Sequence, residues 1–177
     1  LEAEGRKPHW RFKLDGGRVA WEDLAKGHVE VDTASMSDPV LIREDGLYLY
    51  TLPSVVDDLD MDITHVIRGE DHTTNTGAQI EIFEALIAAG LGAATPKFAH
   101  MPLLVGADGA ALSKRLGSLS VADMRDQGYE PLAITSHLGK IGTSDALEVA
   151  ESLEALGAGF SFDKMGRSPA RYDTDDL

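Results

Sequence analysis

The segment between residues 63 and 105 is patterned as strand, helix, strand, and this order restricts the fold more than any other feature of the sequence. Ile63–Arg68 is a β-branched run of the kind found in buried strands, and Phe98–Val105 is a second apolar run of strand length. Together with a helix between them, these strands predict a parallel βαβ unit, in which ligands bind beyond the carboxyl ends of the strands. We therefore expect the loops at Gly69–His72 and Gly106–Ser118 to face one crevice.

The helix expected between these strands has one apolar face. Asn75 or Thr76 can cap its first N–H groups, and Gly90 is suited to end it. Its large apolar residues recur at helical spacing, at Ile80, Phe83, Leu86 and Ile87. This spacing gives a single apolar stripe that can pack against a sheet.

The residues before this unit predict short strands, one hairpin and one short helix. Three strands are expected first, at Trp10–Leu14, Val19–Trp21 and His28–Val31, and they make this a β-rich segment. A hairpin is expected from Val40–Arg43 and Leu47–Leu52 around the turn at Glu44-Asp45-Gly46, followed by a helix over Ser54–Leu59.

The residues after the unit predict helices separated by Gly and Pro. Three are expected, at Val121–Gln127, Pro131–Gly139 and Ala146–Leu156. The whole pattern predicts an α/β fold with a β-rich start and a helical end.

Composition excludes several classes of protein. The chain has 177 residues and no cysteine, so disulfides and thiolate metal sites are excluded. A net charge of -14 argues against a free-standing nucleic-acid binder. No apolar run approaches the length of a membrane span, so no membrane partner is expected. The first residues, LEAEGRKPHW, contain neither a signal core nor an initiator Met, and we expect the chain to be a piece of a longer, cytoplasmic protein.

The residues Arg68-Gly69-Glu70-Asp71-His72 follow the first strand of the unit and form a candidate ligand site. An arginine at the carboxyl end of a strand can bind a carboxylate through two parallel hydrogen bonds. The glycine allows a ligand to approach the backbone closely. A solvated turn with an internal Arg–Asp pair is the alternative, and the residues alone leave both open.

An acidic cluster precedes that strand, but it does not predict a metal site. Asp58, Asp60 and Asp62 have the spacing that opens a calcium loop. The sixth position of such a loop is Ile63 rather than Gly, and the twelfth is Gly69 rather than Glu, so an EF-hand is excluded. The six histidines are scattered without zinc-site spacing, and no metal site is expected.

The second loop of the unit, GADGAALSKRLGS, carries a serine followed by two cations, at Ser113, Lys114 and Arg115. A lysine on a glycine-rich loop can place its charge on phosphate oxygens in a transition state. The loop lacks the spacing of a P-loop, and a solvated surface loop is the alternative. Tyr50, on the same strand face as Tyr48, either packs against neighbours or binds a ligand through its hydroxyl.

Three stretches together resemble one family, the glutamyl-tRNA synthetases, which are class I aminoacyl-tRNA synthetases of the glutamate/glutamine branch. They are LYLYTLPSVVDDLDMDITHVIRGEDHTTNT, PKFAHMPLLVGADGAALSKRLGSLSV and GYEPLAITSHLGKIGTSD. The similarity extends from about Trp10 to Asp145 and is dense from Asp38 to Ser120. ALSKR resembles the lysine signature of class I enzymes, usually written KMSKS or KLSKR.

The resemblance implies a Rossmann-type catalytic domain that activates glutamate with ATP and Mg²⁺ and transfers the glutamyl group to the 3′ end of a tRNA. It implies glutamate binding by Tyr50, Arg68 and Ser54. It implies ATP binding by the lysine loop and by four further residues, with Lys114 as the catalytic cation that neutralises phosphate charge. The residues implied to bind ATP are Ser113, Lys114, Arg115, Asp71, His72, Leu103 and Leu104.

The sequence departs from the family pattern at several points. The first signature lysine is replaced by Ala111, and Ser54 stands where some members carry Asn. The His-x-Gly-His signature is absent. The resemblance therefore implies a central fragment, inactive alone, of a monomeric glutamate–tRNA ligase. Its implied parts are the end of the acceptor-binding insertion (1–43), the second half of the Rossmann-type domain (44–120) and the start of the stem-contact helices (121–177).

Two other functions stay open. One is a tRNA-modifying relative that glutamylates a tRNA base, although the ALSKR match and the helices after it argue against this. The other is a non-catalytic binding module built from half of a synthetase.

Overall fold

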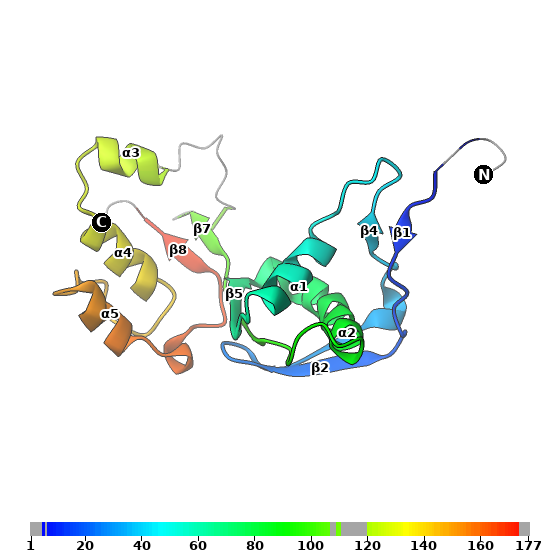
Figure 1. Cartoon of the computed structure of the whole chain (residues 1–177). Helices are drawn as coiled ribbons and strands as arrows, with labels where there is room; N and C mark the ends of the chain where they lie inside the picture. Colours follow the sequence, from blue (N-terminus) through cyan, green and yellow to red (C-terminus); the bar gives the residue numbers. More distant parts are fainter. Residues whose placement is uncertain (1–4, 6, 107–108, 111–119, 174–177) are drawn as a thin grey trace. The chain divides into compact units, whose positions relative to one another are not determined.

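The computed structural model describes Gly5 and residues 7–106, 109–110 and 120–173. They fall into two compact units, Leu1–His100 and Met101–Leu177, coloured blue to green and green to red in Figure 1. Within the part of the chain that is described, no helix has the length and apolar character needed to cross a bilayer.

The first unit begins with two antiparallel strand pairs. β2 (Arg18–Asp23) and β3 (Gly27–Asp32) pair along their whole length, which confirms the two strands expected here. β1 (Trp10–Arg11) pairs with β4 (Val40–Ile42). β1 is shorter than the strand expected over Trp10–Leu14, because the Leu14 amide donates to the Asp38 side chain rather than to a neighbouring strand.

The hairpin after β4 is only partly formed. Its turn is confirmed, since the Arg43 amide donates to the Leu47 carbonyl and Tyr48 pairs with Ile42. The second arm still pairs at Leu49, whose amide donates to the Leu41 carbonyl. Its expected end at Leu52 is wrong, because α1 (Thr51–Asp60) already begins at Thr51. Pro53 lies in the first turn of α1, where a missing N–H breaks no helical hydrogen bond, so the helix starts earlier than expected.

The strand, helix, strand order is confirmed. β5 (His65–Gly69) leads through the 3₁₀ turn η3 (Glu70–His72) into α2 (Thr73–Ala88), and the chain returns in β6 (Lys97–Met101), which pairs with β5. Gly90 ends α2 as expected. It has a φ of 84°, and the Leu91 amide donates to the Leu86 carbonyl, as in a Schellman motif.

The expected N-terminal cap of α2 is wrong. The helix begins at Thr73, because η3 runs directly into it, and Asn75 and Thr76 lie inside its first turns. The Thr76 hydroxyl contacts the His72 carbonyl and side chains of the first unit instead of capping the helix.

α2 lies at the centre of the first unit. Its residues from Thr76 to Phe83 are all buried, so more than one face is covered and not only the expected stripe. Val55 of α1 and Phe98 of β6 share a core with it, to which α2 contributes Ile80, Ile82 and Phe83. Leu86 and Ile87 are partly buried against that core. Gly77 allows the close approach of β3, because a Cβ there would lie 2.9 Å from Cβ and Cγ1 of Val31.

The second unit combines a parallel strand pair with short helices. β7 (Leu104–Gly106) pairs with β8 (Ala170–Tyr172). The single strand expected over Phe98–Val105 is wrong, because Pro102, which cannot donate to a ladder, separates β6 from β7. The helices are α3 (Val121–Asp126), α4 (Pro131–Lys140) and α5 (Leu153–Gly159).

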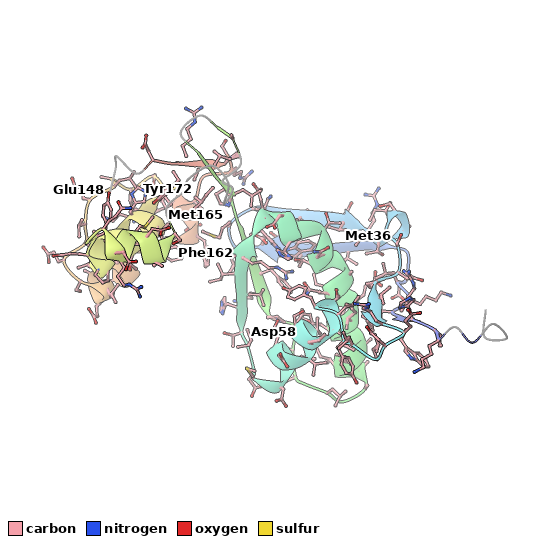
Figure 2. All side chains as sticks on the ribbon, turned by 90° about the horizontal axis from the view of Figure 1, so that it is seen from above. Met36, Asp58, Glu148, Phe162, Met165 and Tyr172 are labelled. Carbon is pink, nitrogen blue, oxygen red and sulfur yellow. The ribbon has the colours of Figure 1, made fainter. Side chains whose placement is uncertain are left out.

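α3 and α4 confirm the first two helices expected in this part of the chain. The third helix, expected over Ala146–Leu156, is wrong in its first half, because α5 begins only at Leu153. Residues 146–152 are not helical, since the Ala150 amide donates to the Ser136 hydroxyl and Ser152 caps the first turn of α5. The core of this unit contains Tyr172 of β8, labelled in Figure 2, packed with Met124, Ile134, Ile141 and Ala170. Two further 3₁₀ turns are η2 (Thr33–Ser35) and η4 (Phe162–Lys164).

Candidate functional site

The candidate site lies at the carboxyl end of β5, where Arg68 meets residues from α1 and α2. Tyr50 directly precedes α1 and is 57% exposed, and Ser54 is half-buried in the first turns of the same helix. The structure therefore brings together the three residues that the resemblance implies for glutamate binding.

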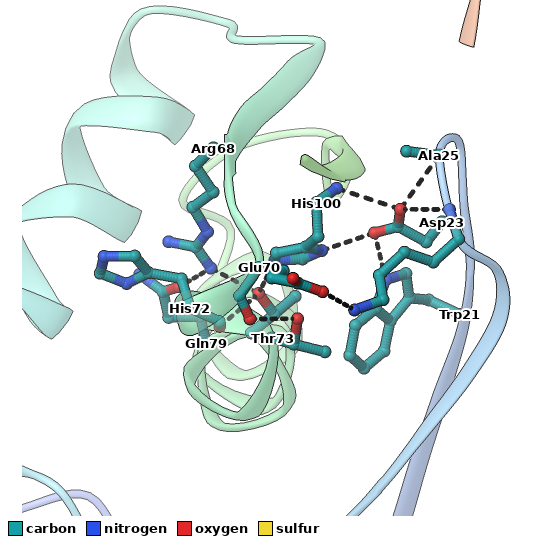
Figure 3. Close-up of polar contacts among 11 residues, drawn as sticks. Trp21, Asp23, Ala25, Arg68, Glu70, His72, Thr73, Gln79 and His100 are labelled. Atoms are coloured by element: carbon teal, nitrogen blue, oxygen red, sulfur yellow. Dashed lines mark hydrogen bonds and ion pairs between the residues drawn. The ribbon is translucent and has the colours of Figure 1, made fainter. Parts of the chain in front are cut away.

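Three neutral side chains hold the Arg68 guanidinium, and Figure 3 labels one of them, Gln79. Nη1 donates to the Tyr50 hydroxyl at 3.2 Å. Nη2 donates to the Thr76 hydroxyl and to Oε1 of Gln79, each at 2.5 Å. Gln79 in turn donates to the Ser54 hydroxyl at 2.9 Å. These contacts use three of the five N–H donors of an arginine.

The Arg68 charge has no carboxylate partner within 4.0 Å among the described residues. The alternative of an internal Arg–Asp pair in this turn is therefore wrong. Asp58 of α1, labelled in Figure 2, interacts electrostatically with the Arg68 charge but forms no ion pair with it among the described contacts. Burial raises the pKa of the Asp58 carboxyl, the Arg68 charge opposes that rise, and Asp57 adds to it, so that the pKa lies above its ordinary value.

Two donors of Arg68 remain: the second Nη1–H and the Nε–H, which is buried without a partner among the residues that the structure describes. The Tyr50 hydroxyl accepts from Nη1 and keeps its own proton to donate. Tyr50 and Nη1 thus present adjacent donors on the exposed side of the guanidinium. Such a pair, next to an unneutralised positive charge, is suited to bind a carboxylate.

A second set of contacts leads from Arg68 to the interior of the unit. The Thr76 hydroxyl contacts Nε2 of His100 at 2.8 Å, and Nδ1 of His100 contacts Oδ2 of Asp23 at 2.5 Å. Asp23 also accepts from the backbone amides of His100, Lys26 and Ala25. The side chains of His100 and Asp23 are both fully buried.

The protonation states of this pair follow from their surroundings. Burial alone raises the pKa of Asp23, but hydrogen bonds from His100, Lys26 and Trp21 outweigh it and hold the pKa below its ordinary value. Burial lowers the pKa of His100 despite the opposing effect of Asp23. The pair is therefore an ionised Asp23 beside a neutral His100 at neutral pH.

Asp71 and His72 lie next to this site. His72 packs its ring against Tyr50, with ring centroids 5.8 Å apart, and its Nε2 lies 3.9 Å from Asp71. Both have side chains open to solvent. Glu70 forms an ion pair with Lys26 at 2.6 Å, which ties the β2–β3 turn to η3.

The other residues implied to bind ATP lie in the second unit or outside the described residues. Leu104 is part of β7 and packs against the core of the second unit, and Leu103 is 43% exposed beside it. Ser113, Lys114 and Arg115 lie outside the described residues. Among the residues that are described, no group of three or more potential ligands could hold a metal ion.

Sequence reasoning missed four polar residues of this site: Gln79, Thr76, His100 and Asp23. The sequence pattern indicates only a helix cap for Thr76, and Gln79 lies among the apolar residues of α2. A histidine inside an apolar strand and an aspartate that ends an alternating strand are unusual enough to have indicated buried polar partners.

Comparison with known proteins assigns this fold to one family. Residues 1–173 match the model of the catalytic domain of class I tRNA synthetases for E and Q. The chain is 66% identical over 177 residues to glutamate–tRNA ligase 2 of Hyphomonas neptunium and 61% identical over 178 residues to glutamate–tRNA ligase 1 of Maricaulis maris. It spans 39% of the length of each of these relatives.

Solved structures show the same relationship. A glutamate tRNA ligase from Elizabethkingia meningosepticum, solved in complex with its amino acid, is 28% identical with a TM-score of 0.81. The match covers 99% of this chain and 38% of that one. The glutamate–tRNA synthetase of Elizabethkingia anophelis is also 28% identical, with a TM-score of 0.82. The chain therefore belongs to the class I tRNA synthetases for glutamate and glutamine and corresponds to part of their catalytic domain.

Proposed function

We propose that this chain is the part of a glutamate–tRNA ligase that recognises the side-chain carboxylate of glutamate. The complete enzyme activates glutamate with ATP and transfers it to the 3′ end of tRNA. The 66% identity to a ligase, the matching family and the geometry at Arg68 support this proposal.

The observation that carries the proposal is the environment of Arg68. Its guanidinium is oriented by three neutral oxygens, and no described carboxylate lies within 4.0 Å to neutralise it. A ligand carboxylate at Nη1 and the Tyr50 hydroxyl would supply the missing charge. A glutamine amide would supply no charge and would direct N–H donors at other donors, so the site favours glutamate.

The remaining roles are proposals from the family resemblance. Lys114, with Ser113 and Arg115, binds the ATP phosphates, and Mg²⁺ enters with ATP as its substrate complex. Asp71 and His72 contact ATP, and the backbone at Leu103 and Leu104 borders the adenine. We further propose that the parent enzyme is a cytoplasmic monomer that binds the glutamate tRNA.

A chimeric enzyme tests the glutamate assignment. This chain replaces the matching 177-residue segment of the Hyphomonas neptunium ligase, and tRNA charging is measured against glutamate concentration. Arg68→Gln removes the charge but keeps a polar side chain of moderate length. We expect the KM for glutamate to rise by about 100-fold or more, since the charge-assisted contact from Nη1 to the ligand carboxylate is lost.

Arg18→Gln is the matched control. Arg18 is 73% exposed at its side chain and pairs with Glu30 on the surface of β3, so its removal leaves the KM for glutamate unchanged. An inactive chimera, or an Arg68→Gln enzyme with the parental KM, contradicts the proposed function.

A further inference from the structure

We propose that Thr76, His100 and Asp23 form a positioning relay that fixes the Arg68 guanidinium for carboxylate binding. The inference rests on the proposed function, since it names the residues that hold the arginine of that same site. None of the three needs to touch the ligand, because each acts through the next.

The hydrogen bonds of the relay have one consistent direction, and Figure 3 shows the contact between His100 and Asp23. An ionised Asp23 can only accept, so Nδ1 of His100 carries the proton in that 2.5 Å contact. The neutral ring then accepts at Nε2, and the single proton of the Thr76 hydroxyl is donated to it at 2.8 Å in preference to the His72 carbonyl, which lies farther away at 3.1 Å. The Thr76 oxygen is left with its lone pairs directed at Nη2 of Arg68. Each hydrogen bond thus fixes the direction of the next one.

The relay also sets where the countercharge of Arg68 lies. The Asp23 carboxylate is fully buried and separated from the guanidinium by two neutral groups, Thr76 and His100. A carboxylate in direct contact would occupy the donors that a ligand needs. Because Asp23 acts through Thr76 and His100, it orients the arginine and leaves the exposed Nη1 side open to a ligand.

Burial makes the relay rigid. Thr76 is 0% exposed and His100 is 1% exposed, so water does not compete for their hydrogen bonds. The His100 ring is also stacked on Phe98, with centroids 6.3 Å apart, and lies 6.0 Å from Trp21. These contacts hold the ring in the plane that points Nε2 at Thr76.

The direction of the relay can be measured without catalysis. We expect long-range ¹H–¹⁵N spectra of the histidine-labelled chain at neutral pH to show His100 as the Nδ1-protonated neutral tautomer. The His100→Gln variant identifies its signal. A proton on Nε2, or a doubly protonated ring, overturns the relay.

Its effect on Arg68 is measured in the chimeric ligase. Thr76→Val keeps the shape of the side chain and removes the hydroxyl, and we expect the KM for glutamate to rise about 10- to 100-fold with the KM for ATP unchanged. Thr76→Ser restores the hydroxyl and should bring the KM for glutamate to within about threefold of the parental value.

Thr33→Val separates positioning from stability. Thr33 is equally buried at 1% exposure, and its hydroxyl also makes two hydrogen bonds, both to Gly17. Both valine variants should therefore unfold at lower temperature, but only Thr76→Val should raise the KM for glutamate. An unchanged KM in Thr76→Val, or an equal rise in Thr33→Val, refutes the relay.

The outcomes distinguish the relay from the proposed function. If Arg68→Gln raises the KM for glutamate and Thr76→Val does not, the function stands and the relay fails. If Arg68→Gln has no effect, the function itself fails. The tautomer of His100 decides on the relay where Thr76→Val does not fold.

Discussion

Replacing Gly77 with alanine tests how closely α2 must pack for the site to form. Gly77 lies in the buried part of α2, directly after Thr76 and two residues before Gln79. Its missing Cβ is what allows the helix to approach Val31 of β3. We expect Gly77→Ala to destabilise the first unit and to weaken glutamate binding.

The magnitude follows from the contact distances. The added Cβ would lie 2.9 Å from Cβ and Cγ1 of Val31 and 3.5 Å from Cγ2. Carbon atoms pack best at about 3.5–4.0 Å. The Cβ of Val31 is fixed to its backbone, so α2 or β3 must move. Such overpacking lowers the free energy of unfolding by about 1–3 kcal/mol. The better helix propensity of alanine raises it by about 1 kcal/mol.

Thermal unfolding of the chain and charging by the chimera measure the two effects. Gly157→Ala is the matched control, because Gly157 lies in α5 with nothing within 4 Å of an added Cβ. The free energy of unfolding should rise by about 1 kcal/mol in the control. The free energies of unfolding of the two variants should therefore differ by about 1–3 kcal/mol. Val31→Ala should partly relieve Gly77→Ala, since it removes Cγ1 and leaves Cβ. Equal stabilisation by both alanine variants would refute the packing argument.

Three further predictions concern single side chains. Tyr50→Phe removes one donor to the ligand and should raise the KM for glutamate in the chimera about 3- to 10-fold, whereas Tyr48→Phe should not. His137→Leu should raise the free energy of unfolding by about 1–2 kcal/mol, because both ring nitrogens of His137 are buried without partners, whereas His65→Leu on the surface should have no effect. The pKa of His100 lies below its ordinary 6.5, so the unfolded chain takes up its proton first as pH falls. Denaturant unfolding should therefore show stability lost below about pH 6.5, with a smaller loss in His100→Gln.

Local sequence signals predicted most of the elements and few of their ends. The alternation in β2 and β3 and the glycine after α2 act within a few residues, so these predictions are confirmed. The helix expected over Ala146–Leu156 failed for a tertiary reason. The amide of Ala150 is hydrogen bonded to Ser136, which lies on another helix, and a pattern within one segment does not contain that contact.

The candidate site also combines residues that the sequence indicates with residues that only tertiary contacts reveal. The family resemblance implies Tyr50, Arg68 and Ser54, and the structure brings these three residues together. Thr76 and His100 were not predicted as partners, because they are 24 residues apart and meet where α2 packs against β6. Their roles depend on which group each contacts. A sequence alone shows that a polar residue is buried more readily than it shows what satisfies it.

The neutral contacts around Arg68 are unexpected in a chain with so many acidic residues. The sequence carries 30 acidic residues against 16 basic ones, and a half-buried arginine in such a chain would ordinarily find a carboxylate. Arg68 instead contacts a phenol, a threonine hydroxyl and an amide oxygen. Each of these accepts a hydrogen bond without cancelling the charge. The nearest acid along the relay, Asp23, is held apart by two side chains. A structural role alone would be served equally well by a direct ion pair, so keeping the charge unneutralised is best explained by a ligand that brings the carboxylate itself.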